Sequence, residues 1–157
     1  MKAPKDRAHI KGGSMKLVQH LLDSKGRGII SVTADASVLD AIKIMAEKAV
    51  GSLLVMQGDE LQGIVTERDY ARKVIVKGRS SKSTEVGEIM TAKVCTATLQ
   101  DTVNHCMSIM TDRKIRHLPV VDDGKVIGLI SIGDLVEAII TDQQEEIEHL
   151  EHYISGQ

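Results

Sequence analysis

Two short motifs contain the residue types from which a ligand site could be built. Thr66 stands three residues before Asp69, and Ser131 stands three residues before Asp134. At the start of a helix such a hydroxyl accepts a backbone N–H, and the acid is stabilised by the positive helix end. An ionised Asp can also accept hydrogen bonds from the 2′ and 3′ hydroxyls of a ribose. The residues alone leave helix capping and nucleoside binding open as alternatives.

Cationic side chains near both motifs are candidates for binding a phosphate group. They are Arg68, Arg72, Arg116 and His117. An Arg guanidinium offers a bidentate fork that suits phosphate oxygens, and helix N-terminal amides add further donors. The alternative for each is a solvated surface charge. This alternative is weaker for Arg116 and His117, because they stand at the start of a predicted strand beside Pro119, where a charge without a binding partner is unfavourable.

The two motifs belong to an internal duplication. Residues 63–69 (Gly-Ile-Val-Thr-Glu-Arg-Asp) recur 65 positions later as residues 128–134 (Gly-Leu-Ile-Ser-Ile-Gly-Asp). The same offset continues upstream without gaps, as a repeated structural unit requires. At the positions equivalent to Arg116 and His117 the first copy has Gly51 and Ser52. We therefore expect two sites of unequal affinity for phosphate.

Hydrophobic periodicity and turn residues predict the same element order, β-α-β-β-α, in each copy. The helix caps are Ser37 and Thr102, and tight turns are expected at Gly58-Asp59 and Asp123-Gly124. The expected elements are strand 30–33, a helix from 38, strands 52–56 and 61–65 and helix 67–76, then strand 94–96, a helix from 103, strands 117–121 and 126–130 and a helix from 132. The pattern predicts an α/β (α+β) fold.

The duplication and the composition of the chain ends divide the chain into four parts. Residues 1–14 are a polar, basic leader or cloning remnant, 15–84 hold the first copy with its linker, 85–140 hold the second copy, and 141–157 form a C-terminal helical tail. In the tail, Ile147, Leu150 and Ile154 recur at spacings of three to four between glutamates, a narrow stripe suited to a partner helix.

Composition excludes several classes of function. The formal net charge of −2 and the absence of Trp and Phe argue against nucleic acid as a partner. No apolar run reaches the roughly 20 residues that span a bilayer, so a cytoplasmic protein without a membrane partner is expected. Cys95 and Cys106 have no metal-like spacing, and neither they nor the His residues predict a metal site.

The motifs together resemble a known family. Residues 53–55 (Leu-Leu-Val) and 118–120 (Leu-Pro-Val), each followed by its Gly-x-x-Thr/Ser-x-x-Asp segment, are similar to the cystathionine-β-synthase (CBS) domain pair, or Bateman module. The resemblance implies two repeats packed with pseudo-two-fold symmetry, usually in homodimers. It also implies binding of AMP, ADP, ATP, NAD or S-adenosylmethionine in clefts between the copies, and it favours nucleoside binding over capping alone.

Adenine would need an apolar slot with backbone hydrogen bonds. Candidates are Val32, Thr33, Ala34, Gly51 and Leu53 in the first copy, and Ala97 and Thr98 with residues 115–118 in the second. We expect a regulatory, signal-transducing module that binds AMP or NAD without a metal, is not an enzyme, and acts on an unknown downstream partner. A ligand-free dimerisation scaffold is one alternative. A nucleotide-processing enzyme is the other alternative, but the sequence contains neither a paired nucleophile and base nor a P-loop.

Overall fold

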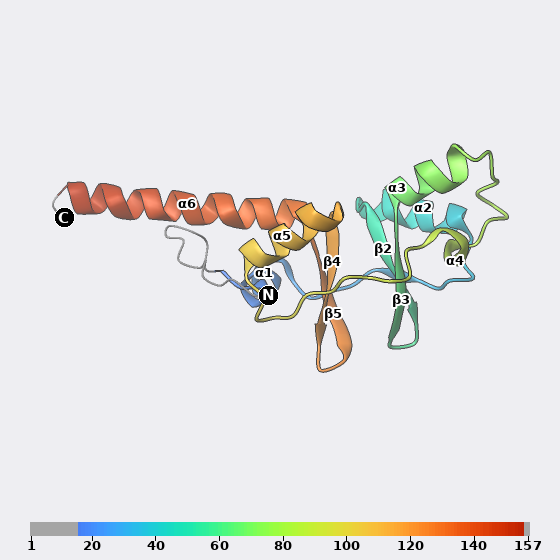
Figure 1. Ribbon diagram of the computed structural model, residues 1–157, viewed down its shortest axis with the longest axis horizontal. Helices are drawn as coiled ribbons and strands as arrows, with labels where there is room; N and C mark the ends of the chain where they lie inside the picture. The colour runs from blue at the N-terminus through green and yellow to red at the C-terminus, as the bar shows by residue number, and fades with distance from the viewer. Residues whose placement is uncertain (1–15, 156–157) are drawn as a thin grey trace. The chain divides into compact units, whose positions relative to one another are not determined.

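Apart from one expected strand, at 94–96, the helices and strands of the computed structural model follow the predicted order (Figure 1). The structure describes residues 16–155, so the expected leader 1–14 lies outside the described residues. The elements are α1 (Val18–Lys25), β1 (Ser31–Val32), α2 (Val38–Lys48), β2 (Ser52–Gln57), β3 (Glu60–Thr66), α3 (Glu67–Tyr70), the π-helical segment Ala71–Ile75, α4 (Val86–Ile89), α5 (Val103–Arg113), β4 (His117–Asp122), β5 (Lys125–Ser131) and α6 (Ile132–Ile154). The expected α+β fold with a C-terminal helical extension is confirmed.

The duplication extends to the ends of the helices. The Ser37 hydroxyl accepts the Asp40 N–H at the start of α2, and the Thr102 hydroxyl accepts the His105 N–H at the start of α5, both at 3.0 Å. Both helices end on a left-handed residue, Ala49 with φ 57° and Lys114 with φ 56°. Equivalent residues therefore terminate equivalent helices, with the same backbone geometry.

The strands form two sheets, one in each copy. In the first sheet β1 pairs parallel with β2, and β2 pairs antiparallel with β3. The second sheet consists of β4 and β5. The expected strand at 94–96 is wrong, because no ladder of hydrogen bonds joins this segment to β4. The tight turns are confirmed, with positive φ at Gly58, Asp123 and Gly124.

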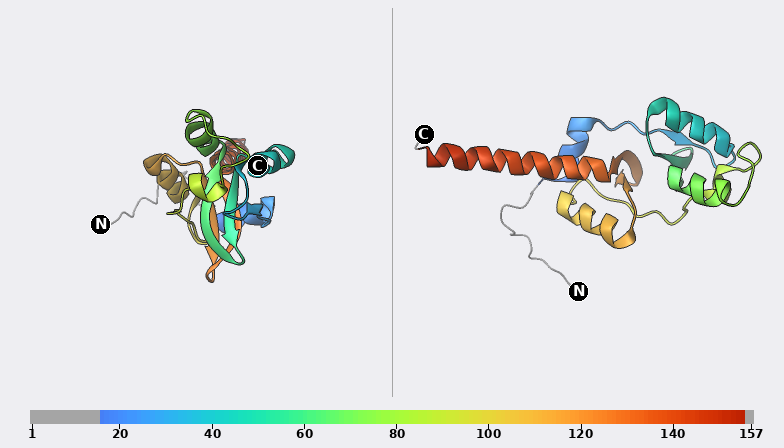
Figure 2. Two further views of the ribbon diagram at one scale, coloured as in Figure 1. Left: turned by 90° about the vertical axis from the view of Figure 1, so that its right-hand side faces the viewer. Right: turned by 90° about the horizontal axis from the view of Figure 1, so that it is seen from above.

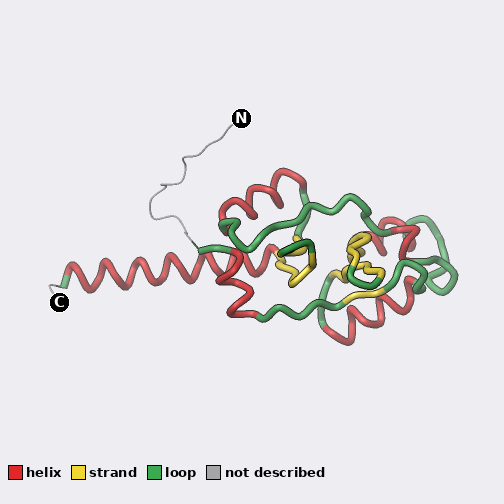
Figure 3. Tube along the Cα trace, turned by 90° about the horizontal axis from the view of Figure 1, so that it is seen from below, coloured by secondary structure: helices red, strands yellow, loops and turns green. Residues whose placement is uncertain are grey.

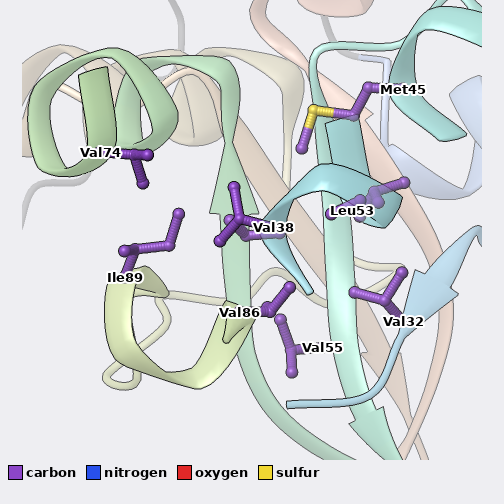
Figure 4. Close-up of a cluster of buried hydrophobic side chains, with 10 residues drawn as sticks. Val32, Val38, Met45, Leu53, Val55, Val74, Val86 and Ile89 are labelled. Carbon is purple, nitrogen blue, oxygen red and sulfur yellow. The ribbon is translucent and has the colours of Figure 1, made fainter. Parts of the chain in front are cut away.

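The described chain divides into two compact units. One contains residues 28–96 and 119–129, and the other contains residues up to 27, 97–118 and 130 onward. In the first of these units β2 is buried on both faces. Leu53 and Val55 point into a core beneath α2 and α4, which Figure 4 shows with Val38, Val86 and Ile89. Leu54 and Met56 point to the opposite face, where Val126 and Leu129 pack against them.

The helix that precedes each copy is hydrogen-bonded to the other copy. α4 precedes the second copy, yet Val86 N donates to Ala36 O at 2.9 Å. α1 precedes the first copy, yet Val18 N donates to Asp101 O at 2.9 Å. Each compact unit is therefore built from segments that alternate along the chain with segments of the other unit. The predicted division between residues 84 and 85 follows the sequence repeats and stays a prediction.

Candidate functional site

Thr66 and Asp69 join β3 to α3 by a reciprocal pair of hydrogen bonds. The Thr66 hydroxyl accepts Asp69 N–H at 3.1 Å, and Asp69 Oδ2 accepts Thr66 N–H at 2.9 Å. Asp69 is only 9% exposed, and its Oδ1 lies 3.2 Å from Lys73 Nζ, which also donates to Ile89 O at 2.8 Å. Helix capping is thus confirmed, and it leaves the carboxylate next to a cation.

Ser131 and Asp134 form the equivalent box between β5 and α6. Asp134 N–H donates to the Ser131 hydroxyl at 3.2 Å, and Asp134 Oδ2 accepts Ser131 N–H at 2.8 Å. The same Oδ2 lies 2.6 Å from Lys25 Nζ at the end of α1. Asp134 is less buried than Asp69, with 23% of its side chain exposed. In each copy a carboxylate and a hydroxyl at the start of a helix therefore meet a lysine, which for Asp134 comes from α1. We refer to these two groups as the Asp69 cluster and the Asp134 cluster.

The residue before β2 lies beside the Asp69 cluster, and the residue before β4 lies beside the Asp134 cluster. Gly51 O accepts the N–H of Glu67, the first residue of α3, at 3.1 Å. Arg116 O accepts the N–H of Ile132, the first residue of α6, at 2.9 Å. The two bonds are equivalent in the duplication, so the structure brings Arg116 to the Asp134 cluster and a glycine to the Asp69 cluster. The Arg116 side chain is exposed.

The strand register separates part of the predicted adenine slot from the Asp69 cluster. Ser52 pairs with Thr66, while Val32 pairs with Val55. Thr33 and Ala34 follow Val32 and so lie near the other end of β2, about 17–20 Å from Gly51 at 3.3 Å per residue. The Thr33 hydroxyl donates to Asp35 Oδ1 at 2.6 Å, and Ala34 O accepts Gly87 N–H at 2.8 Å. The structure thus does not bring Thr33 and Ala34 to Asp69.

Three residues near the clusters were missed by the sequence analysis. Continuing the β1–β2 register places Ile29 beside Ser52, and Ile29 is 36% exposed, which offers an apolar surface at the correct end of the sheet. Lys73 could have been found, because it follows Asp69 at the i,i+4 helical spacing. No local signal connects Lys25 or Ile29 to either cluster.

The other predicted site residues differ in exposure. Leu53 and Ala97 are fully buried, Val32 is 9% exposed and Pro119 is buried within β4, so they could reach a ligand only through the backbone. Thr98 N–H already donates to Asp101 Oδ2 at 2.8 Å. Arg68 and Arg72 are exposed on the helix that follows Thr66, and His117 is half-buried.

The described part of the chain has no metal centre, and one of its two cysteines is buried and protonated. Among residues 16–155 no three His, Cys, Asp or Glu side chains are placed to hold a metal ion. Burial, with the Asp101 charge, raises the pKa of the Cys106 thiol to about 12, so it stays protonated and poorly nucleophilic at neutral pH. Within the same residues, no helix combines the length and apolar character needed to cross a membrane.

Both copies match one family of known proteins. Residues 26–76 and 86–141 match the family described as "CBS domain". The chain belongs to the CBS domain family. The match covers both hydroxyl-and-carboxylate motifs, Thr66 with Asp69 and Ser131 with Asp134, and confirms that the duplication is a pair of CBS repeats.

Named relatives and solved structures agree with this assignment. The CBS domain-containing protein CBSX3, mitochondrial, of Arabidopsis thaliana is 45% identical over 148 residues, which cover 88% of this chain and 72% of the relative. A putative signal-transduction protein with CBS domains from Burkholderia ambifaria is 55% identical, with a TM-score of 0.79 over 82% of this chain and 96% of its own. The CBS domain pair of protein MJ0100 is 28% identical, with a TM-score of 0.70 over 79% of this chain and 95% of its own. It was crystallised with 5′-methylthioadenosine and S-adenosyl-L-methionine.

Proposed function

We propose that this CBS pair is a regulatory module that binds an adenine nucleotide, with AMP or NAD as the first candidates. The observation that carries the proposal is the repeated cluster of a helix-capping carboxylate, a hydroxyl and a lysine at Asp69 and Asp134. Solved relatives support the ligand class, because the MJ0100 pair holds two adenosine derivatives. In this proposal the ribose hydroxyls donate to the carboxylate, which keeps its capping bond to the backbone.

The proposed contacts include every residue that the sequence singled out. Near the Asp69 cluster they are Thr66, Asp69, Arg68, Arg72, Gly51 and Leu53, whereas Val32, Thr33 and Ala34 lie near the other end of β2. The second set consists of Ser131, Asp134, Arg116, His117, Pro119, Ala97 and Thr98. To these we add Lys73 and Ile29 near Asp69, and Lys25 near Asp134. A 5′-phosphate would find two cations, Lys25 and Arg116, near Asp134. Near Asp69 the residue equivalent to Arg116 is Gly51, so the Asp134 cluster is proposed as the tighter site.

Regulation requires that the nucleotide bind one state of the protein more tightly than another. The proposed module acts as a homodimer in the cytoplasm, needs no metal, and passes its state to a downstream partner rather than converting the nucleotide. Two alternatives make different predictions. A pure scaffold would retain no nucleotide after purification, and an enzyme would release product from AMP, ATP or NAD during incubation.

Ligand-induced thermal stabilisation tests the proposal. A nucleotide at about 100 times its Kd should stabilise the folded chain by roughly 2.7 kcal/mol. Asp134→Ala should remove most of this increment and Asp69→Ala a smaller part. Asp142→Ala is the matched control, because Asp142 is another carboxylate of α6 and pairs with Lys16 at 3.3 Å. Undiminished increments in both cluster variants would refute the ribose assignment. Mass spectrometry of small molecules released from denatured protein would identify the ligand.

A further inference from the structure

α6 has an exposed apolar stripe formed by Val136, Ile140, Ile147, Leu150 and Ile154. Its N-terminal half packs through Leu135 and Ala138, which are buried, and contacts α5. Figures 1 and 2 show α1 and α5 beside this first part only, and Figure 3 shows the helix continuing as one unbroken coil. From Gln143 onward every described residue of α6 is exposed. Ile147 and Leu150 are each 54% exposed, and Ile154 is 80% exposed.

The apolar residues of this stripe follow a heptad repeat. Ile140, Ile147 and Ile154 are seven residues apart and occupy position a. Val136 and Leu150 occupy position d, and the d position between them holds the polar Gln143. Ile at a with Leu at d is the pattern of two-stranded coiled coils. The stripe from 136 to 154 is about 28 Å long at 1.5 Å per residue, which is long enough to seat one partner helix.

The charges that flank the stripe are all acidic. Positions e and g of the heptads hold Glu137, Glu146 and Glu151 as their only ionisable groups besides Tyr153, and α6 contains no Lys or Arg. A second copy of α6 in parallel would place Glu146 opposite Glu151, so like charges select against self-pairing. His149 and His152 lie at positions c and f, away from the stripe.

We propose that the stripe of α6 is a docking surface for a basic amphipathic helix of a partner protein. Such a helix would place Ile and Leu against Ile147, Leu150 and Ile154, and Lys or Arg beside Glu146 and Glu151. α6 begins at the Asp134 cluster, so one continuous helix connects that cluster to the docking stripe. The inference names the partner class of the regulator proposed above and rests on it for nucleotide control, whereas docking itself needs no nucleotide.

Binding of a labelled synthetic peptide to the full chain tests the docking surface. The probe is a three-heptad helix with Ile at a, Leu at d and Lys at e and g, and its control has Glu at e and g. Fluorescence anisotropy should show the lysine peptide binding at least about tenfold more tightly. Its affinity should fall as salt is raised, because the flanking pairs are exposed and screened.

Two charge-matched double variants locate the surface. Glu146→Lys with Glu151→Lys should weaken binding of the lysine peptide about tenfold or more, because both residues flank the stripe. Glu145→Lys with Glu148→Lys changes the net charge equally but at positions f and b, and should alter affinity less than about threefold. Equal losses in the two variants would overturn the proposal, because they would show general attraction to an acidic helix.

The identity of the occupant is tested by Ile147→Asn. This exposed substitution should abolish peptide binding and leave the nucleotide-induced thermal shift unchanged. If sedimentation shows a wild-type dimer that Ile147→Asn dissociates, the occupant is a second copy and the proposal is wrong. Peptide binding without any nucleotide-induced shift would refute the proposed function alone and support the docking surface.

Discussion

Lys25 and Asp134 are 109 residues apart in the sequence, and their side chains form an ion pair of 2.6 Å. The pair forms because α1 is anchored to the second copy, where Gln19 N donates to Leu99 O at 3.0 Å. Asp134 therefore has a cation beside it before any nucleotide arrives. In the proposed site, a nucleotide bound through its ribose at Asp134 would place its 5′-phosphate near the same ammonium group.

Lys25→Met should separate the role of Lys25 in phosphate binding from its contribution to stability. The Lys25 side chain is 40% exposed, so its ion pair should contribute about 1 kcal/mol or less to the free energy of unfolding. AMP should lose more affinity than adenosine, because only AMP has a phosphate for the ammonium group to bind. Paired thermal-shift titrations with the two ligands measure this. Arg27→Met is the control, since Arg27 pairs with Asp23 at 3.6 Å. An equal loss for both ligands would contradict the phosphate role.

Gly51→Arg should strengthen phosphate binding at the Asp69 cluster. A Cβ at this position would meet its nearest neighbouring atom, Glu67 Oε1, at an ordinary 3.5 Å, so a side chain can begin here without a clash at Cβ. The new guanidinium would restore the residue type that the second copy has at Arg116. The measurement is AMP affinity in an Asp134→Ala background, with Gly51→Ala for comparison. We expect a severalfold gain for Arg and none for Ala.

The capping hydroxyls should contribute to stability without any ligand. Thr66→Ala and Ser131→Ala each remove the acceptor for a helix N–H, which typically costs about 1 kcal/mol. Urea unfolding of the ligand-free chain measures the loss. Ser155→Ala removes a hydroxyl that donates to His152 O at the end of α6, and it should change the free energy of unfolding by less than about 0.5 kcal/mol. A cap variant as stable as this control would refute the capping contribution.

Gly63→Ala should destabilise the first copy. A Cβ at Gly63 would lie 2.6 Å from Thr91 O and 2.8 Å from Met90 Sδ, so backbone must move to admit it. Such overpacking usually costs roughly 1–3 kcal/mol. Gly51→Ala, with its nearest contact at 3.5 Å, is the matched control in the same unit. Equal unfolding midpoints for the two variants would show that the space between Gly63 and Thr91 O can admit a methyl group without cost.

Burial of Cys106 should make the chain less stable at alkaline pH. Its folded pKa is raised to about 12, whereas an unfolded thiol ionises near 8.5. The unfolded state therefore loses its proton first, and the free energy of unfolding should fall as pH rises above roughly 9, by up to about 1.4 kcal/mol per unit. Cys106→Val should lack this component in a comparison of pH slopes. Identical slopes would show that Cys106 does not set this dependence.

The sequence by itself determined the local and periodic features of this protein. The offset of 65 residues predicts two copies, and both capping boxes form as their three-residue spacing requires. Helix ends, tight turns and the heptads of α6 depend on residues within a few positions of one another. Such features are fixed by backbone hydrogen bonding and side-chain spacing inside one segment, so the sequence shows them directly.

Only the tertiary structure decided which distant residues meet. α1 precedes the first copy but is hydrogen-bonded to the second, which brings Lys25 to Asp134. The β1–β2 register places Ile29 rather than Thr33 beside Ser52. The segment at 94–96 has strand-forming residues but no partner ladder, so it stays without strand structure. These outcomes depend on how separate segments pack and pair, because a strand register or an ion pair across 109 residues has no counterpart in local spacing.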